Sequence, residues 1–201
     1  MNKVLVELKN INLSRNNKEI ISNMSLSLYS SSVINIFGQN GSGKTSLLKI
    51  LVGITEPSSG NVIYNIEEAK QNGISYIGHR YGVKNNLTLN ENLLYGNSNY
   101  LVEQSDIDEM ITKYSMVKFK NYLTKHLSHG QQKKISLMKA NMSDAKIWVI
   151  DEPYSALDKD AIMILDKSIN EHIKNSGSVV MTNHEEINNK EYDINNIEIN
   201  K

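Results

Sequence analysis

The strongest constraint on the fold is the octapeptide Gly38-Gln39-Asn40-Gly41-Ser42-Gly43-Lys44-Thr45, which fits the pattern G-x-x-x-x-G-K-[ST]. A short apolar run, residues 33–37, precedes it, and a helix-length apolar stretch, residues 46–52, follows it. Glycines let the backbone turn tightly and point its N–H groups at a polyphosphate, and the helix adds the positive end of its dipole. The alternative is a glycine-rich turn with a chance lysine. The flanking strand and helix favour a phosphate-binding loop on an α/β fold.

Four side chains have chemistry that suits this site. Lys44 supplies a compact positive charge for the β- and γ-phosphates, and the hydroxyl of Thr45 can ligate Mg²⁺. Asp151 and Glu152 follow residues 146–150, an apolar run without alternation that predicts a buried parallel strand. One of these carboxylates can hold Mg²⁺, and the next can orient or deprotonate a water molecule.

The composition narrows the class of protein. A length of 201 residues fits one α/β domain, residues 1–201, with a small subdomain. The 22 Lys and Arg residues balance the 22 Asp and Glu residues, which argues mildly against a nucleic-acid-binding protein. The chain has no cysteine, so disulfides and zinc-thiolate sites are excluded. No apolar run approaches the length of about 18 residues that crosses a bilayer, and no signal peptide is visible. We therefore expect a cytoplasmic protein that is not inserted in the membrane and reaches it through a partner.

The first thirty residues have the alternating pattern of antiparallel strands, whereas the strand before the phosphate loop has the apolar pattern of a buried parallel strand. Residues 4–8 and 24–28 alternate between apolar and polar, with a turn signal at Asn16-Asn17. Short strands are predicted at residues 61–64 and 74–77. A mainly parallel sheet is expected to carry the phosphate loop and its functional residues along one edge.

The middle of the chain, about residues 87–142, is predicted to form a small helical subdomain. Within it Ser105 and Asp108 resemble a capping box. The segment Leu127-Ser128-His129-Gly130-Gln131 is expected to open a further helix, whose N-terminus would be a second anion-binding site.

The last third is predicted to contain a helix over residues 162–173 and a buried strand over residues 179–182. His184 stands just beyond this strand. The polar tail from Glu185 is expected to be loosely held. Two residues earlier in the chain could also meet a ligand: the guanidinium of Arg15 could stack on a base, and His79 would stand at the end of a strand.

In this order the motifs resemble the ATP-binding cassette of ABC transporters over nearly the whole chain. The signature sequence LSGGQ is matched by residues 127–131, with His129 in place of the first glycine. Residues 38–45 match the Walker A loop and residues 147–151 match Walker B. The D-loop is matched by Ser155-Ala156-Leu157-Asp158. Glu152 takes the place of the catalytic glutamate, and His184 that of the switch histidine.

This resemblance implies an α/β P-loop NTPase with a RecA-like, mainly parallel sheet, an N-terminal antiparallel portion and a helical subdomain. It implies ATP and Mg²⁺ as cofactors, with Thr45 and Asp151 organising the metal. It further implies that Glu152 is the general base and that His184 contacts the γ-phosphate. A second copy of the cassette would face the first head to tail. Ser128 and the backbone at Gly130 would then contact the ATP of the partner copy.

Some positions depart from the family pattern. His79 stands where the Q-loop glutamine is usual, and Arg15 where an aromatic residue usually stacks on adenine. Lys134 and Lys139 stand where arginine is common. The stretch 77–93 resembles the ATPase subunit of the haem exporter used in cytochrome c maturation. That resemblance implies integral membrane subunits as partners, at the cytoplasmic side of the bacterial inner membrane.

Three other functions remain open. The chain could be the cassette of another exporter, for lipoprotein release or drug efflux. It could be a soluble ABC ATPase that acts on ribosomes or DNA, although such proteins usually carry two cassettes or a long coiled-coil insertion. It could be a cassette that binds nucleotide without hydrolysing it. Retention of Lys44, Asp151, Glu152 and His184 argues against the last of these.

Overall fold

The computed structural model describes residues 3–65, 73–79, 81–95 and 102–199. The chain divides into two compact units. The first unit comprises Met1–Tyr76, Asp144–Pro153 and Asn170–Lys201, and the second comprises Ile77–Ser143 and Tyr154–Ile169. Within the described ranges, none of the helices combines the length and the apolar character needed to cross a bilayer.

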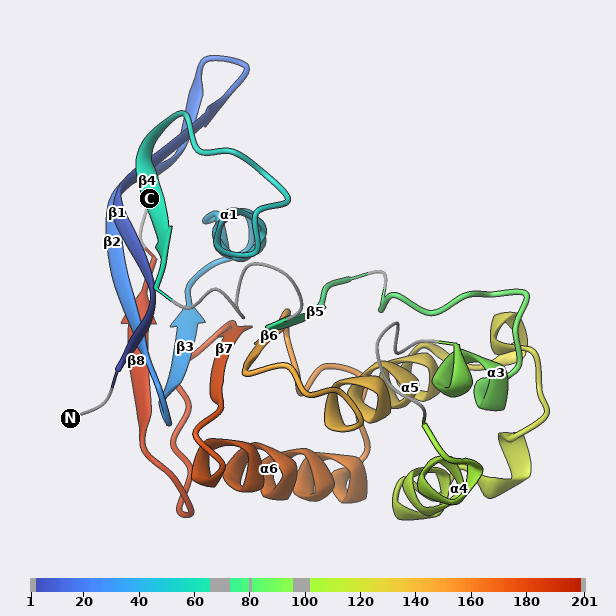
Figure 1. Ribbon diagram of the computed structural model, residues 1–201. Helices are drawn as coiled ribbons and strands as arrows, with labels where there is room; N and C mark the ends of the chain where they lie inside the picture. Colours follow the sequence, from blue (N-terminus) through green and yellow to red (C-terminus); the bar gives the residue numbers. More distant parts are fainter. Residues whose placement is uncertain (1–2, 66–72, 80, 96–101, 200–201) are drawn as a thin grey trace. The chain divides into compact units, whose positions relative to one another are not determined.

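An antiparallel sheet begins the first unit (Figure 1). It contains β1 (Val4–Arg15), β2 (Lys18–Tyr29) and β4 (Ser59–Tyr64), in the order β2-β1-β4. The predicted turn joins β1 to β2, and both of its asparagines have positive φ, 51° at Asn16 and 59° at Asn17. Asparagine tolerates this left-handed conformation better than most residues, which is why Asn-Asn can close a tight hairpin. The antiparallel prediction is confirmed, with strands longer than the sequence pattern indicated.

A second, five-stranded sheet carries the phosphate loop. Its order is β5 (Ile74–Ile77), β6 (Ile147–Ile150), β7 (Ser178–Asn183), β3 (Val33–Phe37) and β8 (Ile194–Glu198). The pairs β6–β7, β7–β3 and β3–β8 are parallel. All four residues of β6 are buried, as expected for a parallel strand covered on both faces. Since β6, β7 and β3 are parallel neighbours, the residues that follow them emerge at one edge of the sheet.

One apolar core joins both sheets of the first unit to helix α1 (Lys44–Leu51). The helix contributes Leu47, Leu48, Ile50 and Leu51, each at most 1% exposed. It ends before Gly53, whose φ of 75° suits glycine best. The core therefore fixes the start of α1, and with it Lys44 and Thr45, against the sheet.

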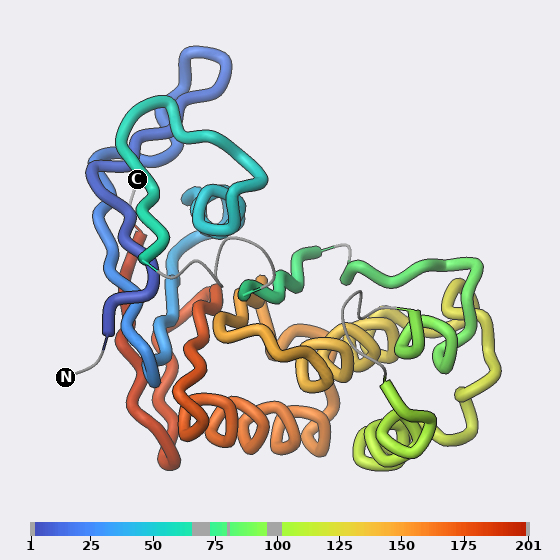
Figure 2. Tube along the Cα trace, in the orientation of Figure 1, coloured from blue at the N-terminus to red at the C-terminus, as the bar shows by residue number. Residues whose placement is uncertain are grey.

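The prediction that the tail from Glu185 is loosely held was wrong. After β7 the chain turns back, and β8 pairs with β3 along its whole length (Figure 2). Ile199 is 7% exposed and belongs to the core, and Ile197 packs against it. The asparagines that made the segment look polar include Asn196, whose side chain is hydrogen-bonded to Asn35 of β3. Polar residues that satisfy one another can therefore be built into a sheet.

The second unit is mainly helical. It contains α3 (Leu89–Leu94), α4 (Gln104–Lys113), the short 3-10 helices η1 (Val117–Phe119) and η2 (Thr124–His126), and α5 (His129–Asn141). Helix α6 (Lys159–Lys174) starts in this unit and ends in the first. Leu165 and Ile169 of α6 are each at most 1% exposed, whereas Ile162 and Ile173 are only partly buried.

The predicted capping box at Ser105 and Asp108 was wrong. Helix α4 begins at Gln104, two residues before the start that a Ser105 cap requires, its N-cap is Glu103, and no side-chain hydrogen bond caps it. Ser105 therefore lies inside the first turn, where its hydroxyl cannot reach the orphan N–H groups. Complete capping boxes occur instead at Thr88 with Glu91 and at Ser128 with Gln131.

A buried aromatic pair lies in the first unit. The rings of Trp148 on β6 and His172 on α6 are stacked, with centroids 4.1 Å apart and an interplanar angle of 12°. Gly177 makes room for the histidine ring, because a Cβ there would collide with it. Burial lowers the pKa of His172 to about 4, although the backbone at Lys146 and Ser178 acts in the opposite sense. His172 is therefore neutral in the folded protein at pH 6.

This pair predicts a pH-dependent stability. Since His172 has a pKa of about 4 when folded and about 6.5 when unfolded, the unfolded chain binds more protons between these values. Stability should therefore fall as the pH drops from about 6.5 towards 4, by on the order of 1–2 kcal/mol. Urea unfolding can be followed at each pH by the fluorescence of the single tryptophan. His172→Phe keeps a ring on Trp148 and should flatten the profile between pH 5 and 6.5. An unchanged slope in that variant would show that another group causes it.

Candidate active site

The loop between β3 and α1 has the backbone that a phosphate cradle needs. Gly38 and Gly43 have φ values of 148° and 106°, which favour glycine. A Cβ at Gly38 would also lie 2.5 Å from the carbonyl oxygen of Ile199. Gln39, Asn40 and Gly41 are exposed at the tip of the loop. The loop is therefore open to a ligand on one side and closely packed on the other.

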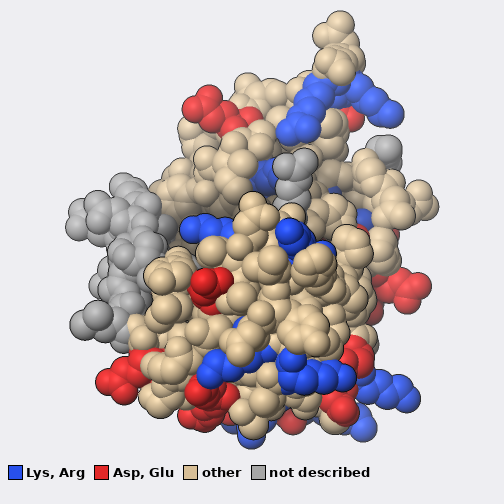
Figure 3. All heavy atoms as spheres, turned by 90° about the vertical axis from the view of Figure 1, so that its right-hand side faces the viewer, with Lys and Arg blue, Asp and Glu red and all other residues tan. Residues whose placement is uncertain are grey.

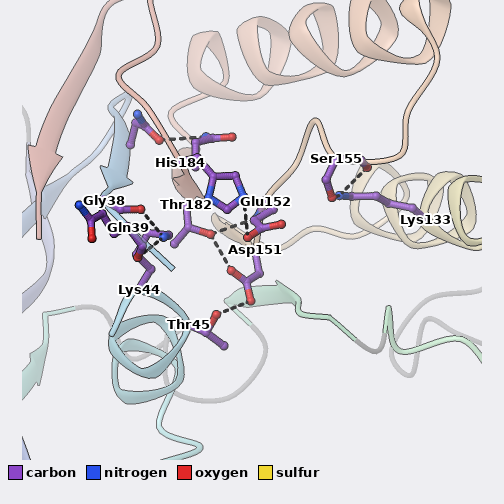
Figure 4. Close-up of polar contacts among 12 residues, drawn as sticks. Gly38, Gln39, Lys44, Thr45, Lys133, Asp151, Glu152, Ser155, Thr182 and His184 are labelled. Atoms are coloured by element: carbon purple, nitrogen blue, oxygen red, sulfur yellow. Dashed lines mark hydrogen bonds and ion pairs between the residues drawn. The ribbon is translucent and has the colours of Figure 1, made fainter. Parts of the chain in front are cut away.

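Lys44 directs its ammonium group back into this loop (Figure 4). Its Nζ donates to the carbonyl oxygens of Gly38, at 2.5 Å, and Gln39, at 3.0 Å, and the residue is 6% exposed. The hydroxyl of Ser42 is buried and has no hydrogen-bond partner among the described residues. An unpaired buried hydroxyl costs about 1–3 kcal/mol, which a bound phosphate oxygen would recover. Positive charge and an unused donor thus converge inside the loop.

Asp151, at the end of β6, is buried and shared between two hydroxyls. Its Oδ2 accepts from Thr45 Oγ1 at 2.9 Å, and its Oδ1 accepts from Thr182 Oγ1 at 2.6 Å. Thr45 comes from α1 and Thr182 from β7, so the carboxylate joins three elements (Figure 4). The oxygens of Thr45 and Asp151 are the hard ligands that Mg²⁺ prefers, and it commonly uses one or two protein groups together with phosphates. The residues present therefore fit this ion.

Glu152 and His184 face each other beside Asp151 (Figure 4). Their Oε1 and Nε2 atoms are 3.4 Å apart, and the side chains are 23% and 55% exposed. Glu152 has φ of 48°, a left-handed conformation that is strained for a residue with a side chain. Its N–H donates to Thr182 Oγ1 at 3.0 Å, which helps to hold this conformation. A carboxylate and an imidazole therefore lie at the same edge of the sheet as the phosphate loop.

In the second unit, α5 begins as the sequence predicted. Ser128 is its N-cap, with its Oγ accepting from Gln131 N–H at 3.3 Å and its own N–H donating to Gln131 Oε1 at 2.8 Å. Leu127 is 6% exposed, whereas His129 is exposed, with its ring in a T-shaped contact with that of Tyr81. A pocket of about 640 Å³ opens at this helix start, lined in part by Ser128, Gly130, Gln131, Lys118 and Lys134.

The D-loop candidates Ser155, Ala156, Leu157 and Asp158 are fixed to the start of α5. Lys133, 1% exposed, donates from Nζ to the backbone oxygen of Ser155 at 3.0 Å and to its Oγ at 2.9 Å (Figure 4). Lys134 pairs with Asp158 at 2.6 Å and holds the pKa of that carboxyl below its ordinary value. A Cβ at Gly130 would collide with the carbonyl oxygen of Ala156. Helix α5 and the D-loop candidate, residues 155–158, therefore pack against each other within the second unit.

Two predicted nucleotide contacts have less support. Arg15 is exposed at the end of β1, and His79 is exposed in the turn after β5. Within the described part of the first unit, no hydrogen bond or ion pair joins the side chain of Arg15 to the phosphate loop. Arg80, in the stretch that resembles the haem-exporter subunit, lies outside the described residues. The contacts of Arg15 and His79 with nucleotide stay predictions.

Comparison with known proteins identifies the family. A family model described as "ABC transporter" matches residues 21–155. The chain belongs to the ABC transporter family. The "Cytochrome c biogenesis ATP-binding export protein CcmA" of Histophilus somni (strain 129Pt) is 34% identical over 190 residues, 90% of this chain and 88% of that protein. The protein of the same name from Colwellia psychrerythraea is 32% identical, over 91% of this chain and 86% of that protein.

Solved structures agree on the fold. A putative ABC transporter ATP-binding protein from Pyrococcus furiosus has a TM-score of 0.78 at 25% identity, covering 96% of both chains. A dimeric ATP-binding cassette in a post-hydrolysis state, bound to ADP and Pi, has a TM-score of 0.77 at 22% identity, covering 90% of this chain and 88% of that chain. The predicted P-loop fold and the resemblance to ABC cassettes are confirmed, and the chain is an ABC-type ATPase.

Sequence reasoning missed two residues of the site. Thr182 was assigned to a buried strand without a role, yet a hydroxyl at the end of an apolar strand, two residues before His184, is a signal for a buried hydrogen bond. Lys133 is spaced three, four and seven residues before Ser136, Leu137 and Ala140, all of them buried. That spacing places the lysine on the buried face of α5, where it needs a partner.

Thr182 provides a test of the Asp151 network. Thr182→Val keeps the shape of the side chain but removes the donor to Asp151 and the acceptor for Glu152 N–H. We expect a loss of about 1–3 kcal/mol in the free energy of unfolding, because a buried charge loses a partner. Urea unfolding followed by Trp148 fluorescence measures it, with Thr55→Val, in the loop after α1, as the matched control. Equal midpoints for the two variants would contradict the importance of the network.

Proposed function

We propose that this ABC-type ATPase is the ATP-hydrolysing subunit of an export complex that serves cytochrome c biogenesis, with haem delivery as the step driven. The observation that carries the hydrolytic part is the meeting of Lys44, Asp151, Glu152 and His184 at the ends of the neighbouring strands β3, β6 and β7. The biological assignment is supported by relatives at 30–34% identity that carry the cytochrome c biogenesis name. The stretch 77–93 supports the same reading.

ATP lies with its phosphates in the loop at residues 38–45. Loop N–H groups and Lys44 bind the β- and γ-phosphates, and Ser42 donates to a phosphate oxygen. Thr45 and Asp151 would hold Mg²⁺, which supplies charge neutralisation between the phosphates. Arg15 is a candidate contact for the base, and His79 is a further candidate nucleotide contact.

Hydrolysis needs a base and a partner for the developing negative charge. Glu152 takes the proton of a water molecule as its oxygen attacks the γ-phosphorus, and the bond to the bridging oxygen breaks to leave ADP and phosphate. His184 donates from its imidazole to the γ-phosphate. The strained backbone at Glu152 fits this assignment, because strained residues concentrate at functional sites.

The second half of the site is proposed to come from another copy of the chain. Leu127 to Gln131 and the D-loop residues Ser155 to Asp158 would meet the ATP held by the partner copy. The N-terminus of α5, with Lys118 and Lys134 beside it, offers the positive potential that a γ-phosphate requires. Hydrolysis would then reopen the dimer and drive integral membrane subunits, at the cytoplasmic side of the bacterial inner membrane.

A nucleic-acid-directed ABC ATPase is less well supported. On the face in Figure 3, Lys and Arg side chains are interspersed with Asp and Glu side chains. This agrees with a formal net charge of zero, and the described residues on that face form no basic band for a phosphate backbone.

Replacement of the base should separate binding from chemistry. Glu152→Gln keeps the size of the side chain but cannot accept the proton, so the turnover number should fall by about 10²–10⁴-fold while ATP affinity is kept. The variant should accumulate as an ATP-bound dimer in size-exclusion chromatography. Lys44→Ala is the matched contrast, since it should lose ATP binding itself. Normal turnover in Glu152→Gln would remove Glu152 from the role of base.

The biological assignment is tested in the cell that encodes the chain. Glu152→Gln on the chromosome should lower covalently attached haem in c-type cytochromes, measured by haem staining of denaturing gels. Spectra of b-type cytochromes should be unchanged, because haem synthesis is not affected. Glu186→Gln, an exposed carboxylate, is the control. Unchanged c-type cytochromes in a strain whose purified variant is inactive would point instead to another exporter, such as one for lipoprotein release or drug efflux.

A further inference from the structure

A carboxamide is buried in the strand that leads to the phosphate loop. Asn35 lies in the middle of β3, between Ile34 and Ile36, and its exposed fraction is 0%. Apolar residues fill the rest of this strand, and β3 has a neighbour on each side. Since an amide buried without hydrogen bonds costs several kcal/mol, the side chain of Asn35 needs hydrogen-bond partners inside the protein.

Those partners lie on both sides of His184. The Oδ1 of Asn35 accepts from Asn183 Nδ2 at 2.9 Å, and its Nδ2 donates to the backbone oxygen of Glu185 at 3.2 Å. The second proton of Nδ2 is used by Asn196 Oδ1, at 2.7 Å. Both donors of the amide and its oxygen are therefore engaged. Two of the three bonds hold the immediate neighbours of the histidine.

Asn196 extends the network one step further along the chain. Its Nδ2 donates to the backbone oxygen of Ile187 at 2.9 Å, and its Oδ1 accepts from Ile187 N–H at 3.1 Å. Residues 183, 185 and 187 are thus tied to strands β3 and β8, while residue 184 between them is not. Amide hydrogen bonds therefore hold the first residues of the segment after β7.

The side chain of His184 is held by few contacts of its own. Its side chain is 55% exposed and makes a contact of 3.4 Å with Glu152. An exposed imidazole that must meet a phosphate oxygen gains from a backbone that is already in place, because misplacement of about 1 Å can cost up to 10²-fold in rate. The amide network supplies this placement.

We propose that Asn35 is a positioning residue that acts through Asn183 and Glu185 to hold His184 at the γ-phosphate end of the nucleotide site. The inference rests on the proposed role of His184 in hydrolysis. It adds a buried residue of β3 to a set that otherwise comes from the phosphate loop, the start of α1 and the ends of β6 and β7.

The test is a double-mutant cycle on the purified, full-length chain. Asn183→Ala removes one bond of the network at a half-buried position, and Asn35→Asp replaces the amide donors with an acceptor facing the oxygens of Glu185 and Asn196. Each is made in the parent chain and with His184→Ala. The turnover number, the KM for ATP and the dissociation constant of ATP are measured. Asn195→Ala, an exposed neighbour on β8, is the matched control.

We expect Asn183→Ala to lower the turnover number by about 10-fold, with the dissociation constant of ATP changed less than about 2-fold. Combined with His184→Ala, the same substitution should have almost no further effect, since the residue it positions is gone. The control should keep full turnover. If the Asn35→Asp variant folds, its turnover number should fall further than that of Asn183→Ala. If Asn35→Asp does not fold, the result for Asn183→Ala decides the question.

The possible failures are distinguishable. A full Asn183→Ala effect that persists in the His184→Ala background would show a general structural role and overturn the inference alone. Unchanged turnover in Asn183→Ala would do the same. If His184→Ala by itself leaves turnover intact, the proposed role of His184 fails first, and the inference falls with it.

Discussion

A carboxylate that is removed from water must keep its oxygens hydrogen-bonded, and Asp151 does so with two threonine hydroxyls. Thr45 is the second residue of α1 and Thr182 the next to last of β7, so one buried carboxylate ties the helix that follows the phosphate loop to two strands. Thr182 then accepts from the N–H of Glu152 and holds that residue in its strained conformation. The positions of Lys44, of the proposed magnesium ligands Thr45 and Asp151, and of the proposed base Glu152 are consequently not independent, because they share this one buried group.

The sequence predicted well wherever a residue type is required by geometry. The loop of residues 38–45 was recognisable because glycine is needed at positive φ, and β6 because an unbroken apolar run fits a strand covered on both faces. Prediction failed where polar residues satisfy one another. Nothing local distinguishes Asn196 of β8 from a solvated asparagine, since its partners Asn35 and Ile187 lie elsewhere in the chain. The hydroxyl of Thr182 signals a buried hydrogen bond, but its partner Asp151 is identified only once β6 and β7 are known to be neighbours.

The signature region explains why one glycine of the family pattern can be replaced and another cannot. The side chain of His129 is exposed and its ring makes a T-shaped contact with that of Tyr81, so the second unit accommodates it. Gly130 has no such freedom, because a Cβ would meet the carbonyl oxygen of Ala156. The departure at His129 is therefore compatible with the packing of α5 against the D-loop candidate, which depends on Gly130 and Lys133.

The segment that follows β6 contains two residues with side chains at positive φ, Glu152 at 48° and Ala156 at 61°. Such conformations persist only where surrounding contacts determine them. For Glu152 the contact is Thr182 in the first unit. For Ala156 the neighbouring Ser155 is held by Lys133, a buried cation whose hydrogen bonds to Ser155 offset part of its desolvation in the second unit. Thr182 thus holds the part of the segment in the first unit, and Lys133 holds the part in the second. Both parts contain residues proposed to act in ATP hydrolysis. The hydrogen bonds that position those residues offset the energetic cost of the backbone strain.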